Sequence, residues 1–327
     1  MKVMVTGGAG YIGSHVAYEL IDAGHDVVVL DNLSTGVREN VPSRATLIEG
    51  DVGNEPMVEA LLRAEGVEAV LHFAGSIVVP ESVAEPLKYY DNNTARSRSL
   101  IAACVSAGVE NFIFSSTAAV YGIPETIPVT EETPTEPINP YGRSKLMTEW
   151  MLRDVSAATS LRHVALRYFN VAGADPEGRT GQSTPEATHL IKIATQTALG
   201  SRESMAIFGT DYATPDGTCV RDYIHVKDLA VAHVLALEHL GEGGPSLLLN
   251  CGYGHGFSVR EVISAVRSAS GVDFEVREGP RRAGDPPALV ANSDRLRETL
   301  GWTPVHDDLD FIVRTALAWE RRLSLDT

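Results

Sequence analysis

Tyr141 and Lys145, in the stretch NPYGRSK (residues 139–145), lie four residues apart, a spacing that places two side chains on one face of a helix. A free tyrosine has a pKa of about 10 and is a poor base at neutral pH. A neighbouring cation favours the phenolate and lowers that pKa. The pair therefore matches a proton-transfer device, although the same spacing on a solvated helix would carry no chemistry.

A glycine-rich segment near the start, VTGGAGYIGSH, holds Gly7, Gly10 and Gly13 between an apolar run and a helical pattern. Glycines at such a position permit a tight turn, close approach of the backbone to a pyrophosphate and close packing of helix on strand. The N-terminus of the following helix supplies N–H donors and positive potential for phosphates. This segment predicts a dinucleotide-binding loop.

Two aspartates follow the next apolar runs. Asp31 lies 18 residues after Gly13, where a carboxylate can accept a hydrogen bond from a ribose 2′-hydroxyl and would repel a 2′-phosphate. This position favours NAD over NADP, although an aspartate can also simply open a turn. Asp51, in EGDV, follows the third run and could reach the adenine amino group.

Small and hydroxyl residues end two further apolar runs. The stretch HFAGS (72–76) leaves room for a flat ring, and FSSTAAVYG (114–122) carries hydroxyls at Ser115, Ser116 and Thr117. Open α/β sheets place their sites at the carboxyl ends of strands. We therefore expect Thr117 and Tyr141 to face the cofactor together.

The elements that must position these residues follow an alternating order. Apolar runs over 2–6, 26–30, 45–49, 68–73, 111–116 and 163–169 read as strands, separated by helical patterns such as 11–24. This order predicts an α/β fold with a doubly wound parallel Rossmann sheet. Beyond residue 170 the loops lengthen, which indicates a smaller mixed α/β C-terminal lobe for substrate. We expect an NAD-binding domain over 1–170, to which a segment of about 226–252 returns, and a substrate lobe over 171–327.

Composition narrows the class of protein. The chain has 327 residues, 44% apolar and 21% charged, with a net charge of −16. Such an acidic surface argues against nucleic acid and anionic membranes as partners, and no apolar run approaches the ~18 residues of a membrane span.

Three cysteines lie far apart without a C-x-x-C pair, so neither a disulfide framework nor a metal site is expected. The first strand begins at Lys2 and leaves no room for a secretory leader, and we expect a cytoplasmic protein.

A series of motifs gives the chain a resemblance to the extended short-chain dehydrogenase/reductases, and among them to the UDP-glucose 4-epimerase family. In order, these motifs are TGGAGYIGS, HFAG, FSSTAAVYG, NPYGRSK, LRYFNVAGA, CVRDYIHVKDLA and PRRAGD. The glycine motif and Tyr-x-x-x-Lys mark only the superfamily, whereas VRDYIHV and PRRxGD are typical of nucleotide-sugar enzymes of epimerase type. The resemblance implies inversion at C4 of a UDP-hexose through transient oxidation, as in the conversion of UDP-galactose to UDP-glucose in galactose metabolism.

The resemblance also implies residue roles. Tyr141 would be the catalytic base and acid, Thr117 would fill the hydroxyl position, and Lys145 would hold the nicotinamide ribose and lower the tyrosine pKa. The residues implied to contact NAD are Gly7, Gly10, Tyr11, Ile12, Gly13, Asp31, Asn32, Asp51, Val52, Phe73, Ala74, Gly75, Asn92, Thr117, Tyr141, Lys145 and Phe169. Those implied to line the UDP-sugar pocket are Thr117, Tyr141, Asn170, His189, Leu190, Ala206, Ile207, Phe208, Arg221, Arg282 and Asp285.

Alternative functions stay open on the same scaffold. A nucleotide-sugar 4,6-dehydratase would carry an acidic pair after the hydroxyl residue, where this chain has Ala118 and Ala119. An NAD-sensing regulator would be expected to lack Tyr141 or Lys145. Epimerisation of UDP-N-acetylglucosamine or a UDP-pentose is a closer alternative, and we expect Leu289, where some members carry tyrosine, to affect that choice. The helices expected within 86–107 and 140–160 resemble the pair that forms a homodimer interface in this family.

Overall fold

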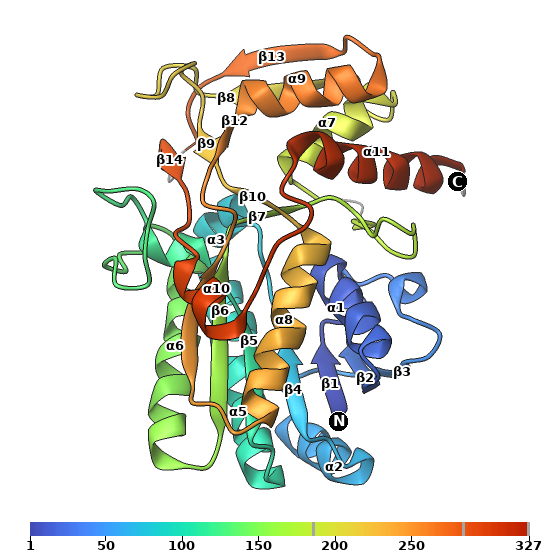
Figure 1. Cartoon of the computed structure of the whole chain (residues 1–327), viewed down its shortest axis with the longest axis vertical. Helices are drawn as coiled ribbons and strands as arrows, with labels where there is room; N and C mark the ends of the chain where they lie inside the picture. Colours follow the sequence, from blue (N-terminus) through green and yellow to red (C-terminus); the bar gives the residue numbers. More distant parts are fainter. Residues whose placement is uncertain (185–186, 283–284, 326–327) are drawn as a thin grey trace.

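The computed structural model describes residues 1–184, 187–282 and 285–325. Its centre is a seven-stranded sheet in the order β11-β6-β5-β4-β1-β2-β3, in which every neighbouring pair is parallel (Figure 1). The strands of this sheet are β1 Lys2–Thr6, β2 Asp26–Asp31, β3 Thr46–Glu49, β4 Ala69–His72, β5 Asn111–Thr117, β6 Arg162–Tyr168 and β11 Leu247–Cys251. The expected α/β fold is confirmed, and the six expected strands match β1 to β6 within one residue at either end.

Helices cover both faces of this sheet, and others belong to the smaller lobe. The helices of the described residues are α1 Tyr11–Asp22, α2 Glu55–Glu65, α3 Val79–Ala84, α4 Pro86–Tyr89, α5 Arg96–Ala107, α6 Pro140–Ala158, α7 Leu190–Ala198, α8 Val226–Gly241, α9 Val259–Ser270, α10 Asp294–Leu300 and α11 Leu309–Leu325, with short turns η1 Arg38–Asn40, η2 Tyr90–Ala95 and η3 Ala118–Tyr121. The turn η2 is a π-helix that joins α4 to α5. The pattern of the sequence did not indicate this turn.

Two apolar cores explain why the strands read as continuous hydrophobic runs. Val3 and Val5 of β1 belong to the core that α1 and α8 share, while Met4 between them belongs to the core under α2, α5 and α6. Successive side chains of a strand point to opposite faces, so a sheet covered on both faces needs apolar residues at every position.

The strand order reverses direction between β1 and β4. From β1 the sheet grows through β2 and β3 on one side and through β4, β5 and β6 on the other. A crevice opens outside the carboxyl ends of the strands at such a switch point, and ligands of α/β proteins bind there. The glycine loop after β1 and the end of β4 both meet this crevice.

The remaining strands build small sheets at the carboxyl side of the large one (Figure 1). They are β7 Asn170–Ala172 with β10 Tyr223–His225, β8 Ser204–Phe208 with β13 Glu275–Gly279, and β9 Val220–Arg221 between β12 Phe257–Ser258 and β14 Ala288–Leu289. Helices α7, α9 and α11 pack around them. The strand β11 joins the edge of the large sheet beside β6, while the division of the chain into two domains stays an interpretation.

In the ranges that the structure describes, no helix combines the length and apolar character needed to cross a bilayer.

Candidate active site

The glycine loop is packed too tightly for any side chain. Gly7 has a φ of +70°, and a Cβ there would lie 2.6 Å from the Ala74 backbone nitrogen. A Cβ on Gly13 would lie 2.3 Å from the Gly7 carbonyl oxygen. The loop backbone and the start of α1, where Gly10 is the N-cap, are therefore free to approach a ligand closely. Such a cradle fits the pyrophosphate of a dinucleotide.

Asp31 is buried at the end of β2, beside this loop. Its Oδ2 accepts a hydrogen bond from the Ala9 backbone N–H at 2.9 Å, and its Oδ1 accepts one from Leu33 at 2.8 Å. A carboxylate oxygen can accept a second hydrogen bond, so the group can still receive a ribose hydroxyl. Its position fits the NAD-selective role expected of it.

Other residues expected to contact NAD lie in different surroundings. Asn32 is exposed, whereas Val52 packs its side chain in the apolar core, so only its backbone could meet a ligand. Asp51 forms an ion pair with Arg96. Ile12 is half-buried against the core of the large sheet.

Tyr141 and Thr117 come together at the carboxyl end of β5. Helix α6 starts at Pro140, and the Asn139 side chain caps it by accepting a hydrogen bond from the Gly142 N–H at 2.9 Å. This places Tyr141 in the first turn, close enough to Thr117 for that hydroxyl to act on its pKa. The two side chains expected to work together therefore lie near each other at the strand end.

The ionisation of the pair differs from the simplest expectation. Burial raises the pKa of Tyr141, and the hydrogen bond with Thr117 opposes that rise. Burial lowers the pKa of Lys145 to about 8. The Lys145 Nζ donates to the Ser115 carbonyl at 2.9 Å. In the protein without its cofactor the pKa of Tyr141 is therefore raised, not lowered as expected.

The segment that follows β4, residues 73–76, passes close to the Lys145 side chain at Gly75. A Cβ on Gly75 would lie 3.7 Å from the Lys145 Nζ and 2.9 Å from the Asn93 Oδ1. The Asn92 side chain donates to the Ser76 Oγ at 2.9 Å. The Phe73 ring packs on His233 with centroids 4.9 Å apart. The structure thus gathers Lys145, residues 73–75 and Asn92 in one place.

Sequence reasoning missed Asn93, which organises this segment. Its Oδ1 accepts a hydrogen bond from the Ser76 N–H at 2.7 Å, and its Nδ2 donates to the Ser144 Oγ at 3.0 Å. Both contacts depend on the π-helix η2, a feature often found at functional sites. The adjacent asparagines of YYDNN were the available signal, but nothing in their pattern shows which one turns inward.

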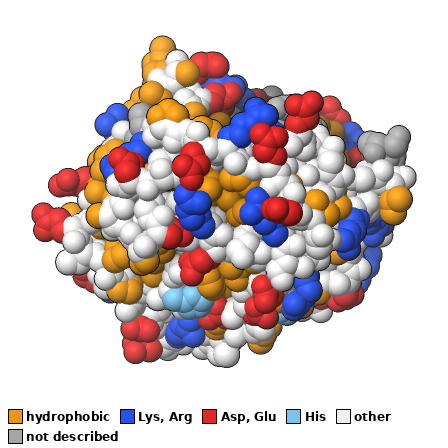
Figure 2. Space-filling view, turned by 90° about the horizontal axis from the view of Figure 1, so that it is seen from above, with side chains coloured by type: hydrophobic (Ala, Val, Ile, Leu, Met, Phe, Trp, Pro, Cys, Tyr) orange, Lys and Arg blue, Asp and Glu red, His pale blue; other side chains and the backbone are white. Residues whose placement is uncertain are grey.

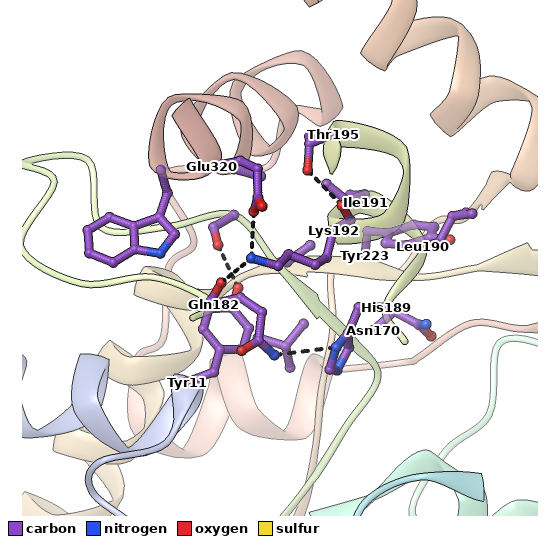
Figure 3. Close-up of a pocket in the computed structure, with 15 residues that line it drawn as sticks. Tyr11, Asn170, Gln182, His189, Leu190, Ile191, Lys192, Thr195, Tyr223 and Glu320 are labelled. Atoms are coloured by element: carbon purple, nitrogen blue, oxygen red, sulfur yellow. Dashed lines mark hydrogen bonds and ion pairs between the residues drawn. The ribbon is translucent and has the colours of Figure 1, made fainter. Parts of the chain in front are cut away.

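A small pocket lies between α1, β7, α7 and α11 (Figure 3). Of the residues expected at NAD or UDP-sugar, it brings together Tyr11, Asn170, His189 and Leu190. The Tyr11 hydroxyl donates to the Gly173 carbonyl at 2.6 Å. Burial, followed by the charge of Lys192, lowers the pKa of His189. Lys192, paired with Glu320 at 2.5 Å, lines the same pocket and was not anticipated.

The expected sugar-nucleotide residues of the smaller lobe form a second group. The Arg221 guanidinium lies 3.7 Å from the Asp285 carboxylate, and Arg282 lies 3.9 Å over the Phe208 ring. Ala206 shares the outer face of β8 with Phe208. Ile207 was expected to contact substrate, but its side chain points the other way into the core, because alternate residues of a strand face opposite sides. Only the Ile207 backbone could serve.

A short ladder joins this group to the catalytic one. Leu289 of β14 is the register partner of Arg221, and its side chain packs in a cluster with Ala118 and Phe169. Ala118 directly follows Thr117. Leu289 therefore connects the two groups: its strand pairs with that of Arg221, and its side chain packs beside the end of β5 that carries Thr117. The face seen in Figure 2 carries acidic and basic side chains interspersed, without a broad basic area.

Comparison with known proteins agrees with this geometry. Residues 3–252 match the model of the NAD dependent epimerase/dehydratase family. A UDP-glucose 4-epimerase of Azospirillum brasilense is 63% identical over 98% of this chain and 92% of the relative. The crystal structure of a UDP-glucose 4-epimerase from Brucella ovis in complex with NAD shares 47% identity with a TM-score of 0.94, covering 97% of each chain. A UDP-Glc/GlcNAc 4-epimerase from Campylobacter jejuni shares 49% identity with a TM-score of 0.86, covering 98% of this chain and 99% of that one. The chain belongs to the NAD-dependent epimerase/dehydratase family, and its relatives place it among the UDP-glucose 4-epimerases of that family.

Proposed function

We infer that this protein inverts C4 of UDP-hexoses and interconverts UDP-galactose and UDP-glucose with NAD as its cofactor. The observation that carries this inference is the placement of Thr117 and Tyr141 next to each other at the carboxyl end of β5 and the start of α6, beside the buried Lys145 and the glycine cradle. Bound NAD would supply reversible hydride transfer at sugar C4, so that net redox would be zero. The loop from Gly7 to Gly13, Asp31 and Lys145 would hold that cofactor.

The chain's own groups supply binding and proton transfer. Tyr141 takes the proton of the sugar 4-hydroxyl and later gives it back, and Thr117 holds that hydroxyl in line. Lys145 supplies the positive charge that favours the phenolate. Arg221 and Arg282 hold the diphosphate, because guanidinium groups match phosphate geometry, and the hexose can turn while the UDP stays anchored. We assign residues 1–170 and about 226–252 mainly to the cofactor, and 171–327 otherwise to the UDP-sugar.

The dehydratase alternative lacks its catalysts. Elimination of water across sugar C5 and C6 needs an acid and a base next to the hydroxyl residue, where Ala118 and Ala119 provide methyl groups. Purified protein incubated with UDP-galactose and no added cofactor should form UDP-glucose to an equilibrium mixture. A dehydrated sugar as product, or a need for stoichiometric added cofactor, would contradict the proposal.

Leu289 gives a basis for the range of sugars. It is buried beside Phe169 and Ala118, close to the catalytic hydroxyls. Leucine is shorter than tyrosine, so we propose weak turnover of UDP-N-acetylglucosamine besides the main reaction. One methylene in an apolar pocket discriminates by about 1–3 kcal/mol. Leu289→Tyr should abolish the weak activity and spare the main one, as measured by kcat/KM for both sugars, and equal loss of both activities would remove Leu289 as the gate.

We further propose a homodimer in the cytoplasm. The short helices α3 and α4 pack on α6, and this neighbourhood exposes large apolar side chains: Leu87 is 79%, Val83 58% and Trp150 47% exposed. Apolar side chains gathered on one surface support an interface there. Cys104, Cys219 and Cys251 are free thiols, which suits a reducing compartment. A mass near the 35.1 kDa of one chain by light scattering would contradict the dimer.

A further inference from the structure

A third residue shares the helix face of Tyr141 and Lys145. Glu149 follows Lys145 by another four residues, and it is buried with Arg167 of β6. We propose that Glu149 and Arg167 are positioning residues that fix the height and rotation of α6 and thereby hold Tyr141 and Lys145 against Thr117. This inference rests on the proposed function of Tyr141.

Each of the three nitrogens of the Arg167 guanidinium donates a hydrogen bond. Its Nε donates to the Glu149 Oε1 at 2.9 Å and its Nη2 to the Glu149 Oε2 at 2.6 Å, a bidentate arrangement. Its Nη1 donates to the Tyr121 hydroxyl at 3.0 Å, and that hydroxyl donates to the Asn250 Oδ1 at 2.6 Å. The guanidinium is thereby connected to α6, η3 and β11 at once.

Glu149 also reaches the strand that carries the catalytic hydroxyl. The Ser116 Oγ donates to the Glu149 Oε1, and Ser116 is the register partner of Arg167 in the β5–β6 ladder. Thr117 is the next residue along β5. The carboxylate of Glu149 is therefore bound from both strands at their carboxyl ends, one residue away from the group that Tyr141 must meet.

The geometry limits how α6 can move. At a rise of about 1.5 Å per residue, Glu149 lies roughly 6 Å along the helix from Lys145 and roughly 12 Å from Tyr141. A slide or rotation of α6 large enough to separate Tyr141 from Thr117 would break the bidentate pair and the hydrogen bond with Ser116 together. These are charge-assisted hydrogen bonds away from water, and losing one partner leaves the other charge buried and uncompensated.

Stability alone does not account for such a pair. Replacing both members of a buried ion pair by apolar residues of similar volume is often neutral or stabilising, whereas removing one member is costly. A pair that contributes only to stability could thus be replaced in full without loss of turnover. A pair that positions α6 could not, because apolar side chains hold the helix by packing without specifying its register.

The test compares Glu149→Gln, Glu149→Asp and the double variant E149L/R167M with wild type. We measure kcat, KM and the apparent pKa of the acidic limb of kcat/KM, together with the melting temperature and the ultraviolet titration of Tyr141, taken as the difference from the same protein carrying Tyr141→Phe. Glu149→Gln should lower kcat at least tenfold, change KM less than twofold, and raise both the apparent pKa and the Tyr141 pKa. Glu149→Asp, which keeps the charge, should recover part of the kcat.

The double variant separates positioning from stability. It should melt close to wild type yet retain the low kcat of Glu149→Gln. As a matched control, Asp228→Asn removes another buried carboxylate, which accepts hydrogen bonds from the Tyr253 hydroxyl at 2.7 Å and the His306 N–H at 2.8 Å. It should lower the melting temperature while kcat stays within twofold of wild type.

Recovery of kcat in the double variant, or an unchanged pH profile and Tyr141 titration in Glu149→Gln, would overturn the positioning role. The titration does not depend on turnover, so the inference stays testable if wild type fails to epimerise UDP-galactose, an outcome that would instead reject the proposed function.

Discussion

Two buried cations, Lys145 and Arg167, are in opposite electrostatic situations. They belong to neighbouring parts of the structure, because Glu149, the ion-pair partner of Arg167, follows Lys145 by one turn of α6. Each residue is only 3% exposed. Burial acts to lower the pKa of Arg167, but the hydrogen bonds and charge of Glu149 outweigh it and the pKa is raised. Lys145 has the Ser115 carbonyl at 2.9 Å and the Phe114 ring at 5.0 Å, and burial lowers its pKa to about 8. In the part of the chain that the structure describes, no carboxylate lies within ion-pair distance of Lys145.

This difference separates a structural charge from a functional one. A compensated cation such as Arg167, whose pKa is raised, keeps its charge and can fix neighbouring elements through its bonds to Glu149. An uncompensated cation is costly to the fold, and its positive charge is available to another group, because no carboxylate cancels it. Perturbed ionisable groups of this kind are typical of active sites.

The largest expected effect is on turnover, and it tests Tyr141, the group that the uncompensated charge of Lys145 is proposed to serve. Tyr141→Phe removes the hydroxyl next to Thr117 while keeping the ring. Loss of general acid–base catalysis costs typically about 10²–10⁴-fold in rate, so turnover should fall by that order with the melting temperature within a few degrees of wild type. Near-wild-type turnover in this variant would contradict acid–base catalysis by Tyr141.

Arg221 is intermediate between the two cations, with its guanidinium 3.7 Å from Asp285 and 13% of its side chain exposed. Removing a hydrogen bond to a charged group costs about 1.5–3 kcal/mol, so Arg221→Ala should raise KM for UDP-galactose about 10–100-fold and change kcat little. Arg281, which is paired with Asp211 on the surface, serves as the control, and Arg281→Ala should leave KM within about threefold. An equal rise in both variants would show that net charge, rather than the Arg221 contact, determines binding.

The smallest expected effect is that of Lys145→Met on stability. Most substitutions lower the free energy of unfolding, but this one should raise it. A lysine whose pKa is lowered by folding is penalised while it is charged, below about pH 8. Lys145→Met removes that penalty, so the free energy of unfolding of the cofactor-free protein should rise by on the order of 2 kcal/mol at neutral pH. The gain should shrink between pH 8 and about pH 10, where the unfolded lysine also loses its proton. Calorimetric melting across this range measures it, and a loss of stability at neutral pH would mean that Lys145 is compensated after all.

Local pattern predicted much of the fold and the site. The strand bounds, the glycine loop, Asp31 at the end of β2 and the meeting of Thr117 with Tyr141 all depend on periodicity and on the rule that sites lie at strand ends. These features need no knowledge of how distant segments align.

The features that sequence reasoning missed depend on register or on local backbone detail. Glu149 and Arg167 are 18 residues apart, and they meet only because β5 and β6 align Ser116 with Arg167. The inward side of Asn93 depends on a π-helical turn. Ile207 was expected to contact substrate because the family resemblance implied it, but the pleat of β8 turns its side chain into the core.

The pH dependence of kcat/KM for UDP-galactose, measured for wild type and Lys145→Met, tests most directly whether the uncompensated charge serves Tyr141. Burial raises the pKa of Tyr141, so a nearby cation is needed to bring the phenolate into the working range. We expect the acidic limb of the profile to move to higher pH in Lys145→Met, with a lower maximum. Superimposable acidic limbs in the two proteins would contradict it.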